Sequence, residues 1–416
     1  MKKLKAIVSS VLSHSLTRSS AVVLTGTMVG NVSAYLYHLF IGRILGPVQY
    51  GELTALLSLL YIINVPTTVL QTVLTKFFSI LKARNAFGKA AYLFSKMTQK
   101  IILIQCAGFV VLLPFTGMIA GFLHITSPMY IVWLYIVFAT TTASIINGSV
   151  LTGFQKFTQA ALYPNIGGIL RLVFGVIGSF FGVGWTLISN IASNIISYFS
   201  YFLSLGFLRR SKAQRFPLSE LNVSSFSLPA FLATLGMTAL YSQDVVLVKH
   251  FFSAYEAGVY GALSVLGRVI FFASFAVGMV VFPVISERKE QSREHGKVVL
   301  YSMLGVGFIS LSILIIYLLF PQFVVHALYG RAYEGAIEYL SLFGLFITLF
   351  SLSYLLTNIS LAANKTGVWM LTVGAAVAQT LLIWVLHGNL GTIVLINTGV
   401  AAVLFASLLI YYRHAQ

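Results

Sequence analysis

Long apolar runs, separated by short polar stretches, recur along the whole chain and constrain its fold more than any other feature. A helix of about 20 apolar residues is long enough to cross the hydrocarbon core of a bilayer. Backbone groups in lipid must pair with one another, so only helices and closed barrels can span it. The runs lack the two-residue alternation of barrel strands. Only 8% of the residues are charged, against about a quarter in soluble domains. The sequence therefore predicts an all-α integral membrane protein.

The number of apolar runs predicts about 12 transmembrane helices, six on each side of a polar stretch near the middle. We expect residues 1–207 to form an N-terminal six-helix bundle and residues 225–416 a C-terminal one, with 208–224 as a cytoplasmic linker. The predicted spans are 19–41, 52–75, 101–123, 129–152, 159–181, 184–207, 225–248, 257–283, 298–320, 337–361, 366–387 and 390–411.

The positions of lysine and arginine predict the orientation, because short loops rich in these residues stay in the cytoplasm. With the N-terminus inside, only Arg43, Lys249 and Arg331 of the 26 fall in outer segments, and two more fall within spans. We therefore expect a multi-pass protein of the plasma or inner membrane with both termini cytoplasmic. The net charge of +17 then reflects topology and contact with anionic membrane lipids, and no nucleic-acid partner is expected.

Two similar stretches stand about half a chain apart. GRILGPVQYGELTALLSLL, residues 42–60, contains Tyr50-Gly51, and EAGVYGALSVLGRV, residues 256–269, contains Tyr260-Gly261. Each opens the second predicted span of its half, at the outer face and in the same chain direction. This repetition predicts two parallel repeats, with a substrate site between the halves near mid-membrane. The glycines themselves are explained by turn formation and close helix packing.

The same stretches resemble the polysaccharide-transport branch, the O-antigen-type oligosaccharide flippases, of the multidrug, oligosaccharidyl-lipid and polysaccharide exporter superfamily. The first-loop pattern of that branch matches Leu45-Gly46-Pro47 followed by Tyr50-Gly51. Its seventh-span pattern, an aspartate before an apolar run and then Gly-x-Tyr, matches Asp244, Gly258 and Tyr260. The resemblance covers nearly the whole chain.

The resemblance implies a MATE-like fold and a function. Members of this branch flip polyprenyl-pyrophosphate-linked oligosaccharides from the cytoplasmic to the outer leaflet, for export of a cell-surface polysaccharide. The implied partners are the lipid-linked oligosaccharide, a polysaccharide polymerase and glycosyltransferases. No cofactor is implied. The fifth-span arginine of the family matches Arg171 in ILRLVFG.

Arg171 and Arg268 are predicted to lie at membrane depth, in the fifth and eighth spans. A charge at that depth costs about 3 kcal/mol, so it normally faces a protein interior or a wet cavity. We expect both residues to bind substrate, because a guanidinium offers paired donors to a pyrophosphate. The structural alternative is an ion pair of either arginine with Asp244, or hydrogen bonds to backbone carbonyls.

Three further charged residues are candidates. Asp244 is the acidic residue predicted to lie inside a span, where it could exchange a proton or bind sodium as the ion-coupling residue. A fixed ion pair of Asp244 with Lys249 or an arginine is the favoured alternative. Arg43 and Lys249, near the outer ends of spans, are candidate substrate-binding residues. For Arg43 a structural role is favoured: Arg43 and Glu52 could pair across the turn, or both could line the outer mouth of the cavity.

The sequence lacks the motifs of the main enzyme and metal-site classes. It contains no His-Glu-x-x-His motif and no phosphate-binding Gly-x4-Gly-Lys-Ser/Thr loop. We therefore expect a non-enzymatic carrier without catalytic residues, metal or cofactor. Two alternatives remain: an ion-coupled drug or organic-cation exporter of the same fold, which would want acidic residues in its cavity, and a membrane enzyme of polysaccharide assembly.

Overall fold

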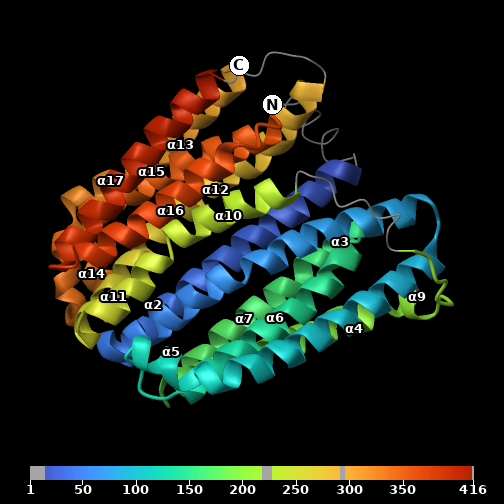
Figure 1. Cartoon of the computed structure of the whole chain (residues 1–416), viewed down its shortest axis with the longest axis horizontal. Helices are drawn as coiled ribbons and strands as arrows, with labels where there is room; N and C mark the ends of the chain where they lie inside the picture. Colours follow the sequence, from blue (N-terminus) through green and yellow to red (C-terminus); the bar gives the residue numbers. More distant parts are fainter. Residues whose placement is uncertain (1–14, 218–226, 291–295, 415–416) are drawn as a thin grey trace, which may run out of the picture. The chain divides into compact units, whose positions relative to one another are not determined.

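The computed structural model describes residues 15–217, 227–290 and 296–414. Regular structure in these residues is entirely helical, which confirms the all-α prediction (Figure 1). Eight helices in this part of the chain are long and apolar enough to cross a membrane, or up to ten if each of two bent helix pairs is one span. The count of about 12 spans and their arrangement in two repeats stay predictions. Residues 218–224 of the predicted linker lie outside the described residues.

The helices follow the apolar runs. In the first half of the chain they are α2 (Ser15–Ile63), α3 (Val65–Ala83), α4 (Phe87–Leu112), the 3-10 turn η1 (Leu113–Phe115), α5 (Thr116–Phe122), α6 (Met129–Gly153), α7 (Phe157–Ser179), α8 (Val183–Ser204) and α9 (Gly206–Arg209). In the second half they are α10 (Ser227–Leu240), α11 (Gln243–Phe251), α12 (Ala254–Glu290), α13 (Gly296–Leu319), α14 (Pro321–Leu328), the 3-10 turn η3 (Arg331–Ala336), α15 (Ile337–Ala362), α16 (Val368–Val385) and α17 (Leu390–His414).

The long helix α2 is interrupted at Gly46, where φ is 67° and ψ is 174°. This left-handed conformation suits a residue without Cβ. Pro47 follows and has no N–H to donate to the preceding turn. The chain therefore turns at Gly46, inside the segment where the sequence predicts the first outer loop.

The described chain divides into two compact units. Unit 1 comprises the described parts of Met1–Tyr37, Pro66–Met118 and Pro128–Val223. Unit 2 comprises His38–Val65, Ile119–Ser127 and the described parts of Ser224–Gln416. The predicted bundles are consecutive in sequence, whereas His38–Val65 and Ile119–Ser127 pack in unit 2 with the C-terminal part of the chain.

Unit 1 is built around α6, which packs against α4, α7 and α8, and α7 also packs against α8. One of its cores joins α3, α4, α6 and α8 through buried side chains that include Phe78, Leu93, Val150 and Leu205. Gly153, at the end of α6, allows this packing. A Cβ there would lie 2.9 Å from the carbonyl oxygen of Thr75.

Unit 2 packs α12 against α13 and α15, α15 against α17, and α16 against α10 and α17. The two similar Tyr-Gly stretches lie against each other in this unit. A Cβ on Gly51 would lie 2.7 Å from the backbone nitrogen of Gly258, and a Cβ on Gly258 would overlap the carbonyl of Pro47. A Cβ on Gly261 would collide with the side chain of Thr54. The repeated glycines therefore bring two backbones into direct contact.

Candidate functional site

Arg171, on α7, is a half-buried cation of unit 1. Its guanidinium carbon lies 4.3 Å from the ring centroid of Tyr37 on α2. Tyr37 is buried, and its hydroxyl accepts a hydrogen bond from Asn190 Nδ2 on α8 at 2.9 Å. The Nε of Arg171 is buried and has no hydrogen-bond partner among the described residues. A ring face attracts a cation but leaves the N–H groups of the guanidinium unused.

Arg268, on α12, is the corresponding cation of unit 2, and it is 8% exposed. Its guanidinium carbon lies 4.7 Å from the ring centroid of Tyr61 and 5.3 Å from that of Tyr241. Its Nε is also buried without a hydrogen-bond partner in the described part of the chain. Both predicted membrane-depth arginines thus stack on tyrosine and carry an unsatisfied donor.

Asp244, at the start of α11, is fully buried and held by neutral donors. Its Oδ2 accepts hydrogen bonds from the Tyr260 hydroxyl at 2.6 Å and from Asn397 Nδ2 at 3.0 Å. Its Oδ1 accepts from the backbone N–H of Val245 at 2.9 Å. Among the described residues no ion pair joins Asp244 to Arg268 or Lys249. The alternative of a fixed ion pair between these residues is therefore wrong.

The hydrogen bonds of Asp244 continue through three amides of unit 2. Asn397 Oδ1 on α17 accepts from Gln379 Nε2 on α16 at 2.7 Å, and Gln379 Oε1 accepts from Gln243 Nε2 at 2.6 Å. Gln379 Nε2 also donates to the carbonyl of Leu240 at 3.0 Å, where α10 and α11 meet at a 40° bend. We call Asp244, Tyr260, Asn397, Gln379 and Gln243 the buried polar network. It satisfies backbone freed by the broken span, as lipid requires.

Lys249, also on α11, is 2% exposed and lies in the interior of unit 2. It interacts electrostatically with Glu52, which is itself buried. Glu52 accepts hydrogen bonds from the backbone N–H and the hydroxyl of Thr126, at 3.0 and 2.5 Å. In the described structure Lys249 is thus covered rather than open to the outside.

Arg43 caps a helix. Its Nε donates to the carbonyl of Leu328 at 2.8 Å, and its Nη2 donates to the carbonyls of Ala327 and His326. These are the terminal carbonyls of α14, which a cation stabilises. Glu52 bonds Thr126 instead, so the predicted pair of Arg43 with Glu52 across the turn is wrong. The substrate-binding roles of Arg43 and Lys249 stay predictions.

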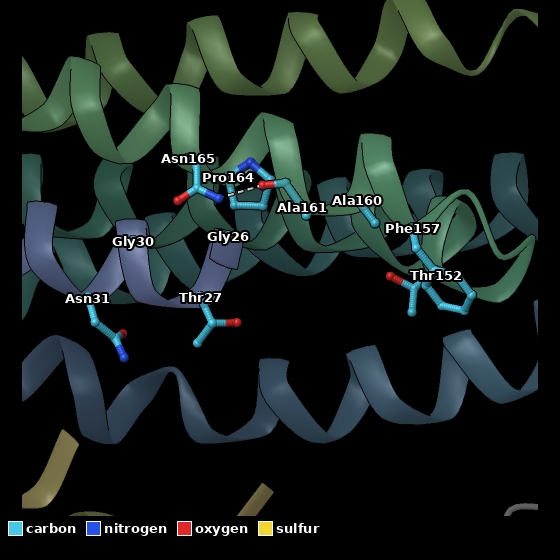
Figure 2. A pocket seen from close by; sticks show the side chains of 10 residues that line it. All are labelled: Gly26, Thr27, Gly30, Asn31, Thr152, Phe157, Ala160, Ala161, Pro164 and Asn165. Atoms are coloured by element: carbon cyan, nitrogen blue, oxygen red, sulfur yellow. Dashed lines mark hydrogen bonds between the residues drawn. The ribbon is translucent and has the colours of Figure 1, made fainter. Parts of the chain in front are cut away.

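A pocket of about 360 Å³ lies within unit 1 (Figure 2). It has hydroxyl and amide groups beside apolar surface, and no charged side chain lines it. Its residues come from α2, α6 and α7: Gly26, Thr27, Gly30, Asn31, Thr152, Phe157, Ala160, Ala161, Pro164 and Asn165. The amide of Asn165 donates to the Ala161 carbonyl at 2.7 Å, which Figure 2 shows as a dashed line.

Some partners of these residues were not identified from the sequence. Tyr61 was not singled out, and Asn397 and Gln379 were not separable from the other amides within spans. The Asp244 and Gly-x-Tyr pattern does contain a usable signal, because its tyrosine, Tyr260, is the residue that bonds Asp244. The described residues contain no group of three or more His, Cys, Asp or Glu that could hold a metal ion.

Comparisons with solved structures show the fold. The chain is similar to an inward-facing multidrug resistance MATE family transporter of the MOP superfamily, with a TM-score of 0.70 and 15% identity over 94% of this chain and 97% of that one. It is equally similar to the lipid II flippase MurJ in an inward closed conformation, with a TM-score of 0.70 and 14% identity over 94% and 87% of the two chains. The predicted MATE-like fold is confirmed.

Sequence comparisons give the family. An uncharacterized membrane protein of Methanocaldococcus jannaschii is 23% identical over 296 residues, which cover 67% of this chain and 69% of that protein. The model of the family described as "Polysaccharide biosynthesis protein" matches residues 41–338, which include both Tyr-Gly stretches, Arg171, Asp244 and Arg268. The chain therefore belongs to the polysaccharide biosynthesis protein family, as its resemblance to the polysaccharide-transport branch predicts.

Proposed function

We propose that the protein flips a polyprenyl-pyrophosphate-linked oligosaccharide from the cytoplasmic to the outer leaflet by alternating access, for export of a cell-surface polysaccharide. The observation that carries the proposal is the state of Arg171, which is half-buried, and of Arg268, which is buried. Each stacks on tyrosine and has a buried Nε without an acceptor among the described residues. An unsatisfied buried donor is costly, and a pyrophosphate is the acceptor that a guanidinium fits best.

The charge of unit 1 supports an anionic cargo. Its described residues include no aspartate or glutamate, so no carboxylate in this part of the chain competes for Arg171. An exporter of organic cations would want acidic groups in its cavity, which this unit does not supply. The family description and the flippase named among the similar structures favour a lipid-linked sugar over a drug as cargo.

Asp244 is the proposed ion-coupling residue. It is a buried carboxylate held by residues of α11, α12 and α17, so a proton bound to it would change contacts among three helices. Its two oxygens accept hydrogen bonds from neutral donors among the described residues, so no fixed cation holds the carboxylate in its charged form. Asp244→Asn is expected to leave transport insensitive to a proton gradient, whereas continued sensitivity would assign coupling elsewhere.

The proposal includes the topology and the partners. The protein resides in the cell membrane with both termini cytoplasmic, and it acts as a carrier that makes and breaks no covalent bond. Glycosyltransferases supply the lipid-linked sugar and a polymerase consumes it on the other side. Cysteine labelling from each side of the membrane, at Arg210 and at Tyr255, tests the orientation, because both side chains are exposed.

A leaflet assay in proteoliposomes tests the function. A fluorescent polyprenyl pyrophosphate bearing one N-acetylhexosamine is followed by a quencher that cannot cross the membrane. We expect wild type to make the inner-leaflet probe accessible, and Arg171→Ala and Arg268→Ala to slow this at least about tenfold, the effect of losing one charge-assisted hydrogen bond. Arg210→Ala removes an exposed arginine of unit 1 and is the matched control.

The outcomes separate the alternatives. If wild type leaves the lipid-linked sugar in place and exports organic cations, the cation-exporter alternative replaces the proposal. If both arginine variants are folded and flip the probe at the wild-type rate, the arginines are structural and the site assignment fails.

A further inference from the structure

We infer that the pocket of unit 1 is a loading subsite for the uncharged sugar next to the pyrophosphate, an inference that rests on the proposed function. The pocket is larger than a packing defect, at about 360 Å³, and it is lined by Thr27, Asn31, Thr152 and Asn165 among apolar neighbours. Hydroxyl and amide groups beside apolar surface, without charge, suit a sugar ring, which has both hydroxyl groups and apolar C–H faces.

Pro164 leaves a backbone carbonyl of α7 without its helical donor. It lies inside α7 and has no N–H, so it cannot donate to the carbonyl of Ala160 four residues earlier. Both residues line the pocket. A carbonyl freed in this way is tolerated at membrane depth where a polar cavity can satisfy it. In the proposed subsite, a sugar hydroxyl would supply the missing donor.

Small residues let the two helices on either side of the pocket approach closely. A Cβ on Gly26 would lie 3.0 Å from Asn165 Nδ2 and 3.1 Å from the Cβ of Ala161, and a Cβ on Gly30 would lie 3.2 Å from Asn165 Oδ1. Glycine spacing of this kind lets α2 and α7 approach closely. Figure 2 shows Thr27 and Asn31 extending from α2 and Asn165 extending from α7. A larger residue at Gly30 would occupy the space beside the Asn165 amide.

The pocket and the cationic site of unit 1 lie along the same two helices, α2 and α7. Pro164 and Arg171 are seven residues apart on α7, and Gly30 and Tyr37 are seven apart on α2. Seven residues are about two helical turns, so each pair shares a face and is separated by about 10 Å. Because Tyr37 contacts Arg171 and Gly30 lies beside Asn165, one α2–α7 interface carries both features. A ligand that reaches both must be elongated, with its anionic part at Arg171 and a neutral polar part in the pocket.

The predicted topology places the pocket where cargo would enter. Residues 26–31 lie around the middle of the first predicted span, and residues 152–165 surround the predicted cytoplasmic turn at Lys156. The pocket is then nearer the cytoplasmic end than Arg171. This order assigns the pocket to capture of the sugar from the cytoplasmic side.

Binding of two probes to the full chain in lipid nanodiscs tests the subsite. One probe is a polyprenyl pyrophosphate bearing one N-acetylhexosamine, and the other is the same lipid without sugar. We expect Asn165→Leu and Asn31→Ala to weaken binding of the sugar-bearing probe at least about tenfold, which corresponds to ~1.4 kcal/mol. In these two variants, the affinity for the probe without sugar should change less than about twofold. Arg171→Ala, in contrast, should weaken binding of both probes.

Asn358→Leu is the matched control, because Asn358 Nδ2 makes the same bond to the carbonyl four residues earlier, at 2.8 Å, away from the pocket. If pocket variants weaken both probes equally, or bind the sugar-bearing probe as wild type does, the subsite is overturned while the proposed function stands. The subsite is also overturned if wild type binds both probes equally. If wild type binds neither probe, the proposed function itself fails.

Discussion

Arg171 and Arg268 both stack on tyrosine within the described structure, but the charges around them differ. The described residues of unit 1 include no aspartate or glutamate, whereas unit 2 buries Asp244 and Glu52. Arg268 also interacts electrostatically with Asp244 at a distance, although the two form no ion pair among the described residues. The positive charge of Arg171 is therefore less compensated. The difference suggests that Arg171 attracts an anionic substrate more strongly than Arg268 does.

The largest expected effect tests the close backbone contact between the two Tyr-Gly stretches of unit 2. Gly258→Leu places side-chain atoms on the carbonyl of Pro47. Because this carbonyl belongs to the backbone, it cannot rotate out of the way as a side chain could. We expect a destabilisation of about 3 kcal/mol or more, and loss of folded protein in size-exclusion chromatography with fluorescence detection. Gly305→Leu is the control, because a Cβ there meets nothing within 4 Å. A folded Gly258→Leu protein would show that the contact is not needed.

The next effect separates the two arginines. We expect Arg171→Glu to slow flipping of the lipid-linked sugar at least about 100-fold, because a charge-assisted bond of about 1.5–3 kcal/mol becomes repulsion. Arg268→Glu should slow it less, since Asp244 already offsets part of that charge. The proteoliposome leaflet assay measures both rates. Equal losses, or a larger loss at Arg268, would remove the distinction between the units.

A smaller effect is expected in the buried polar network. Asp244→Ala removes the acceptor of the Tyr260 hydroxyl and one of two acceptors of the Asn397 amide. An unpaired buried donor costs about 1–3 kcal/mol. Asp244→Asn keeps one acceptor oxygen and should cost less. Thermal unfolding of the two variants in the same detergent measures the difference. An Ala variant as stable as the Asn variant would mean that the network does not hold unit 2 together.

The smallest effect concerns the ring under Arg171. Tyr37→Phe keeps the aromatic face at 4.3 Å and loses the bond from Asn190, worth about 0.5–1.5 kcal/mol of stability. Affinity for the polyprenyl pyrophosphate probe should change less than about threefold. Tyr37→Leu removes the cation–π contact and should lower the affinity for this probe more. If Phe and Leu behave alike in the nanodisc binding assay, the ring does not position the guanidinium.

Local features of the sequence were sufficient for much of the fold. Apolar runs of helical length predicted the all-α membrane class, and Gly46 with Pro47 marked the turn in α2. The burial of Arg268 followed from its place inside an apolar run. These inferences depend on neighbours within a few residues, which a single sequence displays.

Contacts between distant segments were not predictable in the same way. Asn397 and Asp244 are 153 residues apart in sequence, and nothing local distinguishes Asn397 from the other amides within spans. The structural alternative pairs Arg268 with Asp244 because opposite charges attract, whereas the structure stacks Arg268 on Tyr61 and Tyr241. Assignment of His38–Val65 to unit 2 likewise depends on which faces meet, and several apolar faces in this chain are interchangeable by composition.

The contact between Gly51 and Gly258 also couples sequence changes in the two Tyr-Gly stretches. Each stretch forms part of the surface on which the other rests, so a larger residue in one copy alters the space available to its counterpart. The two copies therefore cannot drift independently, even though Tyr50 and Tyr260 now bond different partners. If a chain arose by duplication, its two halves would stay similar in sequence longest at such a contact.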